Sequence, residues 1–163
     1  MITNQNEKAI QKELFPKPSI KYAYRLETRK VKEPDFPYLK SQMSGTKDVL
    51  NFVRTLEDSD IEKMIVLYLN AQNELICISI TPGSINSAVV YPREIVKNAI
   101  LSQASAIIMV HNHPSGHNKP SDHDIHLTDT IRKAMKLIDV LVHDHVIVSE
   151  TGFFSMREEG MLS

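Results

Sequence analysis

The chain has 163 residues, of which 42% are hydrophobic and 24% are charged, as in an ordinary soluble globular domain. Its formal net charge of −1 excludes a basic field over the whole chain, which non-specific nucleic-acid binding would use. The single cysteine, Cys77, excludes an intrachain disulfide and fits a reducing compartment. We expect a cytoplasmic protein without membrane contact, because no signal-peptide pattern and no run of about 18 apolar residues occurs.

The N-terminal part differs from the rest of the chain in its excess of basic residues. Residues 1–19 are polar and predict a tail or linker, and residues 20–33 alternate apolar and charged positions as a strand does. Residues 17–47 hold eight Lys or Arg against three acids. A solvated strand face explains this excess, and weak contact with nucleic acid is the alternative. We predict a tail and basic strand region over residues 1–44, ahead of a domain over residues 45–163.

The rest of the chain mixes helix-like and strand-like segments. Apolar spacing and turn residues predict, in order, a helix over Lys47–Leu56, a hairpin of strands Lys63–Leu69 and Leu75–Ile80, a helix over Pro92–Leu101, a buried strand over Ser105–Val110, a helix from Ser121 to about Ile138, and strands over Val140–Val148 and Phe153–Met156. This order predicts an α/β fold, a sandwich built around one sheet.

The run from residue 111 to residue 124 carries the strongest functional signal. His111 and His113 are two apart at the end of the buried strand, so their side chains point the same way. Asp124 falls in the first turn of the next helix, which can aim its carboxylate back at the strand end. Two imidazoles and one carboxylate form a three-ligand shell for Zn²⁺, with the fourth position left for a water. The pattern predicts a hydrolytic zinc site.

A helix cap is the competing interpretation of part of this run. Ser121 followed three residues later by Asp124 is a capping arrangement, worth about 1 kcal/mol to the helix without any metal. Capping does not explain the pair of imidazoles beside the helix start, so we favour metal binding. Asp122 competes for the third ligand position, but helical geometry gives its side chain another direction.

A zinc hydrolase also needs a general base close to the metal. Glu62 opens the strand Lys63–Leu69 and could stand at a sheet end beside His111. Glu94 lies in the first turn of a helix, where the helix dipole explains a carboxylate without any function. The pattern favours Glu62 weakly and leaves Glu94 open.

The motif His111-x-His113-x7-Ser121-x2-Asp124, with an upstream glutamate, resembles the JAMM motif of the JAB1/MPN metalloprotease superfamily. The sequence around it, His-Asn-His-Pro-Ser-Gly and Pro-Ser-x-x-Asp, resembles the bacterial RadC branch in particular. The resemblance extends to Val90–Val96, to Asp144–Val148, and to Glu62 leading the strand that ends Leu67-Tyr68-Leu69-Asn70. It covers roughly residues 45–161.

This resemblance implies a cytidine-deaminase-like α/β/α sandwich around one mixed β-sheet, holding a single Zn²⁺. His111, His113 and Asp124 then bind the metal. Ser121 helps to hold the water or the oxyanion, and Glu62 is the general acid and base.

Five further histidines are expected to have ordinary roles. His143 and His145 share a strand face among valines, so we expect core residues or neighbours of the site. His117, His123 and His126 lie on the loop and the early helix, where solvent exposure is expected.

Two functions from different classes follow. The first is a zinc-dependent hydrolase of amide bonds, a peptidase or isopeptidase acting on peptide or protein substrates. The second is a RadC-like non-catalytic interaction module associated with DNA repair, touching DNA through residues 17–47. Typical RadC proteins carry a helix-hairpin-helix region ahead of this domain, and residues 1–44 show no Gly-rich hairpin of that sort. A nucleobase deaminase is disfavoured because Pro-Cys-x-x-Cys is absent. A homodimer through an exposed N-terminal edge strand stays open.

Overall fold

The computed structural model describes residues 42–53, 61–82 and 90–162. Within them lie three helices and five strands: α2 (Thr46–Phe52), β1 (Lys63–Leu69), β2 (Leu75–Pro82), α3 (Pro92–Ser102), β3 (Ala106–Asn112), α4 (Asp122–Lys136), β4 (Leu141–Ser149) and β5 (Gly152–Ser155). The predicted tail and the predicted strand over residues 20–33 lie outside the described residues.

The five strands form one sheet in the order β2-β1-β3-β4-β5. β1 pairs antiparallel with β2, which confirms the predicted hairpin, and it also pairs antiparallel with β3. β3 and β4 are parallel, with α4 as the connection between them, and β5 returns antiparallel to β4. The predicted α/β fold around one mixed sheet is confirmed.

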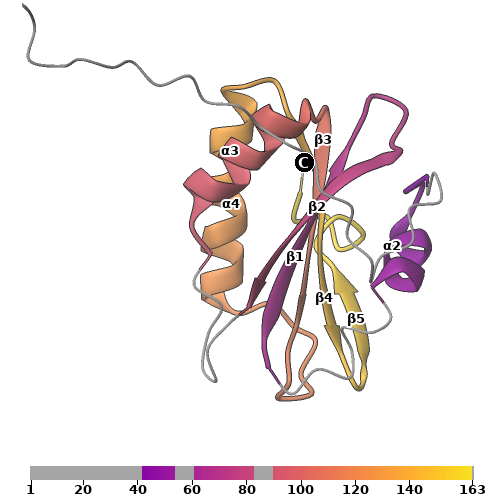
Figure 1. Cartoon of the computed structure of the whole chain (residues 1–163). Helices are drawn as coiled ribbons and strands as arrows, with labels where there is room; N and C mark the ends of the chain where they lie inside the picture. The colour runs from indigo at the N-terminus through magenta and orange to yellow at the C-terminus, as the bar shows by residue number, and fades with distance from the viewer. Residues whose placement is uncertain (1–41, 54–60, 83–89, 163) are drawn as a thin grey trace, which may run out of the picture. The chain divides into compact units, whose positions relative to one another are not determined.

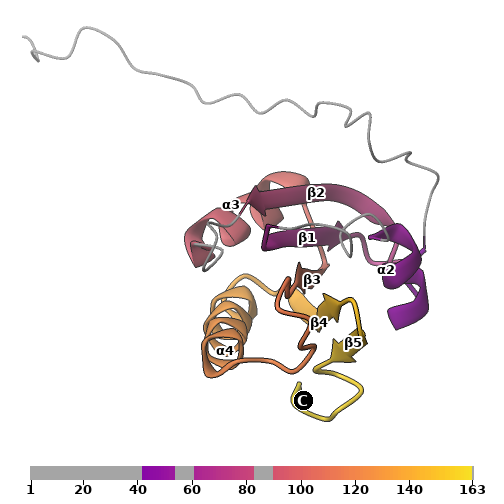
Figure 2. The same cartoon turned by 90° about the horizontal axis from the view of Figure 1, so that it is seen from below.

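Helices lie on both faces of this sheet (Figures 1 and 2). On one face, α3 and α4 pack on side chains such as Met64, Tyr68 and Met109. On the other face, α2 contributes Val49 to a core with Leu67 and other strand residues. Alternate residues along β1 and β3 therefore belong to different cores, as the two-residue period of a strand requires. His111 falls on the same side as Met109, toward α4.

One strand boundary differs from the prediction in a way that matters. The apolar run ends at Val110, but β3 continues to Asn112 because its backbone keeps pairing with β4. His111 lies opposite Ile147 of β4 and opposite Met64 of β1. The polar side chains of His111 and Asn112 interrupt the hydrophobic pattern, but their backbone groups still pair with β4. His111 is thus held inside the sheet and not on a loop after it.

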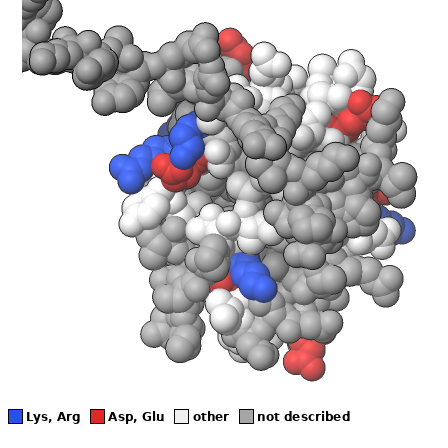
Figure 3. Space-filling view, viewed as in Figure 1, with Lys and Arg blue, Asp and Glu red and all other residues white. Residues whose placement is uncertain are grey.

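The described surface carries charges of both signs. On the face in Figure 3, basic and acidic side chains are interspersed. Some charged side chains of the described residues pair along a helix: Glu94 with Arg93 and Lys97 on α3, and Asp129 with Lys133 on α4. In the described parts of the chain, no helix has the length and apolar character to cross a membrane.

Candidate metal centre

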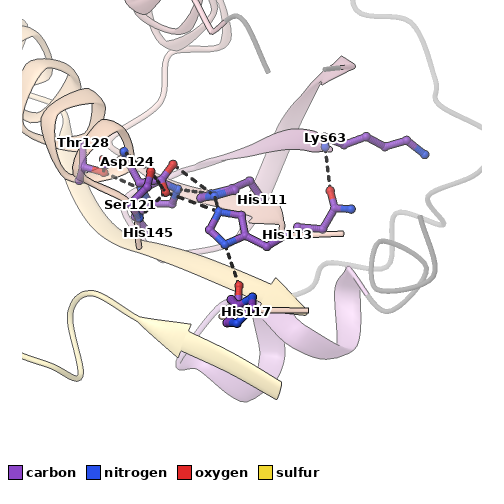
Figure 4. Close-up of polar contacts among 9 residues, drawn as sticks. Lys63, His111, His113, His117, Ser121, Asp124, Thr128 and His145 are labelled. Atoms are coloured by element: carbon purple, nitrogen blue, oxygen red, sulfur yellow. Dashed lines mark hydrogen bonds and ion pairs between the residues drawn. The ribbon is translucent and has the colours of Figure 1, made fainter. Parts of the chain in front are cut away.

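Three side chains converge where β3 ends and α4 begins (Figure 4). One ligand atom from each of His111, His113 and Asp124 lies within 4.8 Å of the others. The Nε2 atoms of His111 and His113 are 2.7 Å apart. Asp124 Oδ1 lies 3.3 Å from His111 Nε2, and Oδ2 lies 3.5 Å from His113 Nε2. The structure brings together the three residues that the sequence predicts as ligands.

The start of α4 explains how Asp124 reaches the strand end. Ser121 is the N-cap: its Oγ accepts from the Asp124 N–H at 3.2 Å, while Asp124 Oδ2 accepts from the Ser121 N–H at 2.8 Å. This reciprocal capping box locks the carboxylate in one orientation. Oδ2 takes the capping bonds and Oδ1 faces His111. Capping and metal binding, which the sequence presents as alternatives, are compatible in this geometry.

The electrostatics of the three groups differ because their burial differs. Burial lowers the pKa of His111 to about 4, since only 1% of its side chain is exposed. The hydrogen bond with Asp124 raises the pKa of the half-buried His113. Burial alone raises the pKa of Asp124, but the hydrogen bond from His113 and the charge of His111 hold it well below its usual value. The site holds an ionised carboxylate.

The contact between the two imidazoles tests whether a cation fits. His113 Nδ1 lies 2.8 Å from the His117 carbonyl, to which it must donate, so only Nε2 of His113 faces the site. Two nitrogen lone pairs repel at 2.7 Å, so the His111–His113 contact requires a proton between them, in the place that a metal ion would take. Ligand atoms that each lie about 2.0 Å from a tetrahedral Zn²⁺ are roughly 3.3 Å from one another. The carboxylate lies near that spacing from both imidazoles, through Oδ1 at 3.3 Å from His111 and Oδ2 at 3.5 Å from His113, whereas the two Nε2 atoms at 2.7 Å would have to separate. The donor types and their convergence fit a metal ion.

The two candidate bases have different surroundings. Glu62 precedes β1, is half-buried, and its negative charge contributes to raising the pKa of His113. Glu94 is on α3, where its bond to Lys97 lowers its pKa and where Arg93 also pairs with it. Pairing on its own helix accounts for Glu94 without a role at the site. The choice between them as general base stays a prediction, with Glu62 the one whose charge acts on a candidate ligand.

Asn112, between the two histidines, fixes the backbone around Glu62. Its Oδ1 accepts from the Lys63 N–H at 2.7 Å, and its Nδ2 donates to the Ile61 carbonyl at 3.1 Å. These are the backbone groups immediately before and after Glu62. Only 2% of Asn112 is exposed, so water does not compete strongly for these bonds. The sequence analysis missed this residue, although its place between two candidate ligands was a usable signal.

The remaining predicted residues are placed as follows. Asp122 is exposed and is not part of the ligand group, as helical geometry predicts. The side chains of His117, His123 and His126 are exposed, as expected. His143 is half-buried and bonds Asn73 Oδ1 at 2.9 Å.

A second buried group lies behind the candidate ligands; the sequence predicted its histidine, His145, as a core residue or a neighbour of the site, and did not single out Thr128. His145 on β4 is fully buried, which lowers its pKa well below the usual value. Its Nε2 lies 2.7 Å from His111 Nδ1, and its Nδ1 lies 2.6 Å from Thr128 Oγ1. Thr128 is four residues after Asp124 and so occupies the same face of α4. The spacing of four residues from Asp124 was the feature of the sequence from which a place for Thr128 near the site could have been predicted.

Comparison with known proteins gives a consistent set of relatives. A family model described as a RadC-like JAB domain matches residues 43–161. A UPF0758 protein of Chlorobium luteolum is 39% identical over 123 residues, which is 74% of this chain and 55% of the relative. A UPF0758 protein of Alteromonas mediterranea is 46% identical over 109 residues, which is 66% of this chain and 48% of the relative.

A third relative, a UPF0758 protein of Methanosarcina mazei, is 36% identical over 142 residues, covering 86% of this chain and 59% of the relative. The chain thus spans between about half and three fifths of the length of these relatives. The region matched by the family model includes β1, β3 and the start of α4, and with them all the residues of the candidate metal centre. The chain belongs to the RadC family of the JAB/MPN superfamily.

Proposed function

We propose that this protein is a zinc-dependent hydrolase of amide bonds, a peptidase or isopeptidase. The observation that carries the proposal is the convergence of His111, His113 and Asp124 within 4.8 Å, with the carboxylate ionised. Two imidazole nitrogens and one carboxylate oxygen suit Zn²⁺, and three protein ligands leave a position open. The cytidine-deaminase-like form of the fold, with helices on both faces of the sheet, is part of the same proposal.

Zn²⁺ held by these residues would supply a water of lowered pKa and would polarise the scissile carbonyl. Glu62 takes a proton from the attacking water and passes it to the leaving amine, as a general base and then a general acid. Asn112 supports this role, because its two hydrogen bonds fix the backbone on both sides of Glu62.

Ser121 is proposed to stabilise the oxyanion that develops on the carbonyl oxygen. In the structure its hydroxyl donates to Asp124 Oδ2 at 2.6 Å, while its backbone N–H makes a separate bond to the same oxygen. The hydroxyl can therefore turn toward an oxyanion while the backbone bond keeps Asp124 oriented. A donor already aimed at the oxyanion is worth about 3 kcal/mol in the transition state, and the Ser121 hydroxyl would contribute less because it must first leave Asp124 Oδ2.

The test compares Glu62→Gln with Glu94→Gln, a matched change at the alternative base. Each protein is loaded with one equivalent of Zn²⁺ and offered a library of internally quenched peptides and a lysine-linked isopeptide. We expect the wild type and Glu94→Gln to cleave, with a chelator stopping the reaction. Glu62→Gln should keep its zinc and lose turnover by at least about 100-fold, since general base catalysis contributes that much.

Two results would contradict the proposal. Undiminished cleavage by Glu62→Gln would refute the role of Glu62 as general base. If the zinc-loaded wild type cleaves none of the probes, the proposal of a hydrolase is refuted. The alternative, an interaction module that contacts DNA through residues 17–47, concerns a segment that lies mostly outside the described residues. Nothing in the described part of the chain favours it.

A further inference from the structure

A continuous chain of hydrogen bonds runs from the helix backbone to the first metal ligand (Figure 4). Thr128 Oγ1 lies 2.6 Å from the backbone carbonyl oxygen of Asp124 and 2.6 Å from His145 Nδ1. On the other side of the ring, His145 Nε2 lies 2.7 Å from His111 Nδ1. All three linking side chains are buried, with 2% exposure or less. Water therefore does not interrupt the chain.

The backbone carbonyl sets the direction of every bond in this chain. A carbonyl oxygen can only accept, so the Thr128 hydroxyl donates its one proton to Asp124. The Thr128 oxygen must then accept from His145, whose Nδ1 carries the proton. The other nitrogen of His145, Nε2, is left with a lone pair. It accepts from His111 Nδ1.

The reverse direction is less favourable and would have the opposite effect on the metal ligand. If Thr128 donated to His145, its oxygen and the Asp124 carbonyl oxygen would face each other at 2.6 Å with no proton between them. His145 would then donate to His111 Nδ1, and the proton of His111 would be on Nε2. That proton would occupy the position at which a metal must bind.

We propose that Thr128 and His145 are positioning residues that hold His111 in its Nδ1-protonated tautomer, so that the Nε2 lone pair faces the metal site. The inference rests on the proposed metal-binding role of His111. Metal-ligating histidines commonly donate their second ring nitrogen to a fixed acceptor, and that bond sets the tautomer and the ring orientation. Here the acceptor is a second buried histidine, and its own tautomer is set by Thr128.

Asp124 takes part at both ends of this arrangement. Its carboxylate lies at the metal site, and its backbone carbonyl is the fixed acceptor that gives the chain its direction. The first turn of α4 thus supplies a ligand and also orients the ligand that comes from β3.

The first experiment measures the tautomers directly in the metal-free protein. Long-range ¹H–¹⁵N correlation spectra of ¹⁵N-histidine-labelled protein distinguish protonated from unprotonated ring nitrogens. We expect the proton on Nδ1 in both His111 and His145, and the proton shared between His111 and His113 on Nε2 of His113. In Thr128→Val, which removes the hydroxyl and keeps the shape, His111 should populate the Nε2-protonated form. An Nε2 proton on His111 in the wild type, or unchanged tautomers in Thr128→Val, would overturn the inference.

The second experiment measures zinc affinity by competition with a chromophoric chelator. Thr128→Val should bind zinc about 10-fold more weakly or worse, and Thr128→Ser, which restores the hydroxyl, should recover to within about 3-fold of the wild type. Thr130→Val is the matched control, because Thr130 Oγ1 donates to the His126 carbonyl at 2.9 Å in the same way on an exposed part of α4. It should keep the wild-type affinity.

Equal losses in Thr128→Val and Thr130→Val, or no recovery in Thr128→Ser, would show that the hydroxyl does not position the ligand. If the wild type binds no zinc, the proposed function fails. The tautomers measured in the metal-free protein would still decide whether the hydrogen-bond chain orients His111.

Discussion

Replacing Asp124 with asparagine separates a metal ligand from a helix cap. An asparagine oxygen can still accept from the Ser121 N–H, which Asp124 Oδ2 accepts at 2.8 Å, so most of the capping box survives. The negative charge beside His111 and His113 is lost. We expect Asp124→Asn to weaken zinc binding by more than about 100-fold, which corresponds to about 2.7 kcal/mol.

The matched variant is Ser121→Ala, which removes the side-chain cap bond to the Asp124 N–H and keeps the carboxylate. An N-cap is worth about 1 kcal/mol and at most about 2 kcal/mol. Even if all of that energy were transferred to the site, zinc affinity would fall by no more than about 30-fold. We therefore expect Ser121→Ala to lose stability and to keep most of its affinity for zinc.

Both variants are compared by chelator competition for zinc and by urea denaturation of the metal-free protein. If the two changes reduce zinc affinity by the same factor, or if the loss in Asp124→Asn stays below 30-fold, capping alone explains Asp124. The assignment of this residue as a ligand would then be wrong.

Two other predictions concern the buried polar groups. Asn112→Ala should lower the free energy of unfolding in urea by about 2 kcal/mol, since two hydrogen bonds beside Glu62 are lost. It should also lower turnover more than zinc affinity. Unchanged turnover would contradict the role of Asn112 in fixing the backbone around Glu62. The metal-free protein should lose about 2 kcal/mol of stability through His111 between pH 7 and pH 5, and His145 should add a loss of the same sign. Burial lowers the pKa of His111 to about 4 and that of His145 well below 6.5, so both side chains take up protons more readily in the unfolded chain than in the folded one. The raised pKa of His113 has the opposite sign and offsets part of the loss. Denaturation curves that coincide at pH 7 and pH 5 would contradict this account.

The strands and the ligand triad were within reach of the sequence because each depends on local spacing. The two-residue period places His111 and His113 on one face, and a Ser-x-x-Asp helix start places Asp124. The roles of His145 and Asn112 depend on which strands are neighbours. His145 approaches His111 because β4 pairs with β3 in parallel, and Asn112 reaches Lys63 because β1 pairs with β3. Strand order is a property of the whole fold, and no local pattern in this chain specifies it.

The alternation of side chains in the triplet from residue 111 to residue 113 has a consequence for how such a protein can vary. Odd positions present imidazoles to α4, and the even position turns its amide toward β1. Shortening or lengthening β3 by a single residue ahead of the triplet would exchange the two directions. Both the pair of candidate metal ligands and the hydrogen bonds of Asn112 to Ile61 and Lys63 would be lost in that one step. Insertions and deletions should therefore be tolerated in the turn before β3, but not within the strand or in the segment from His113 to Ser121, which carries a candidate ligand and the cap of α4.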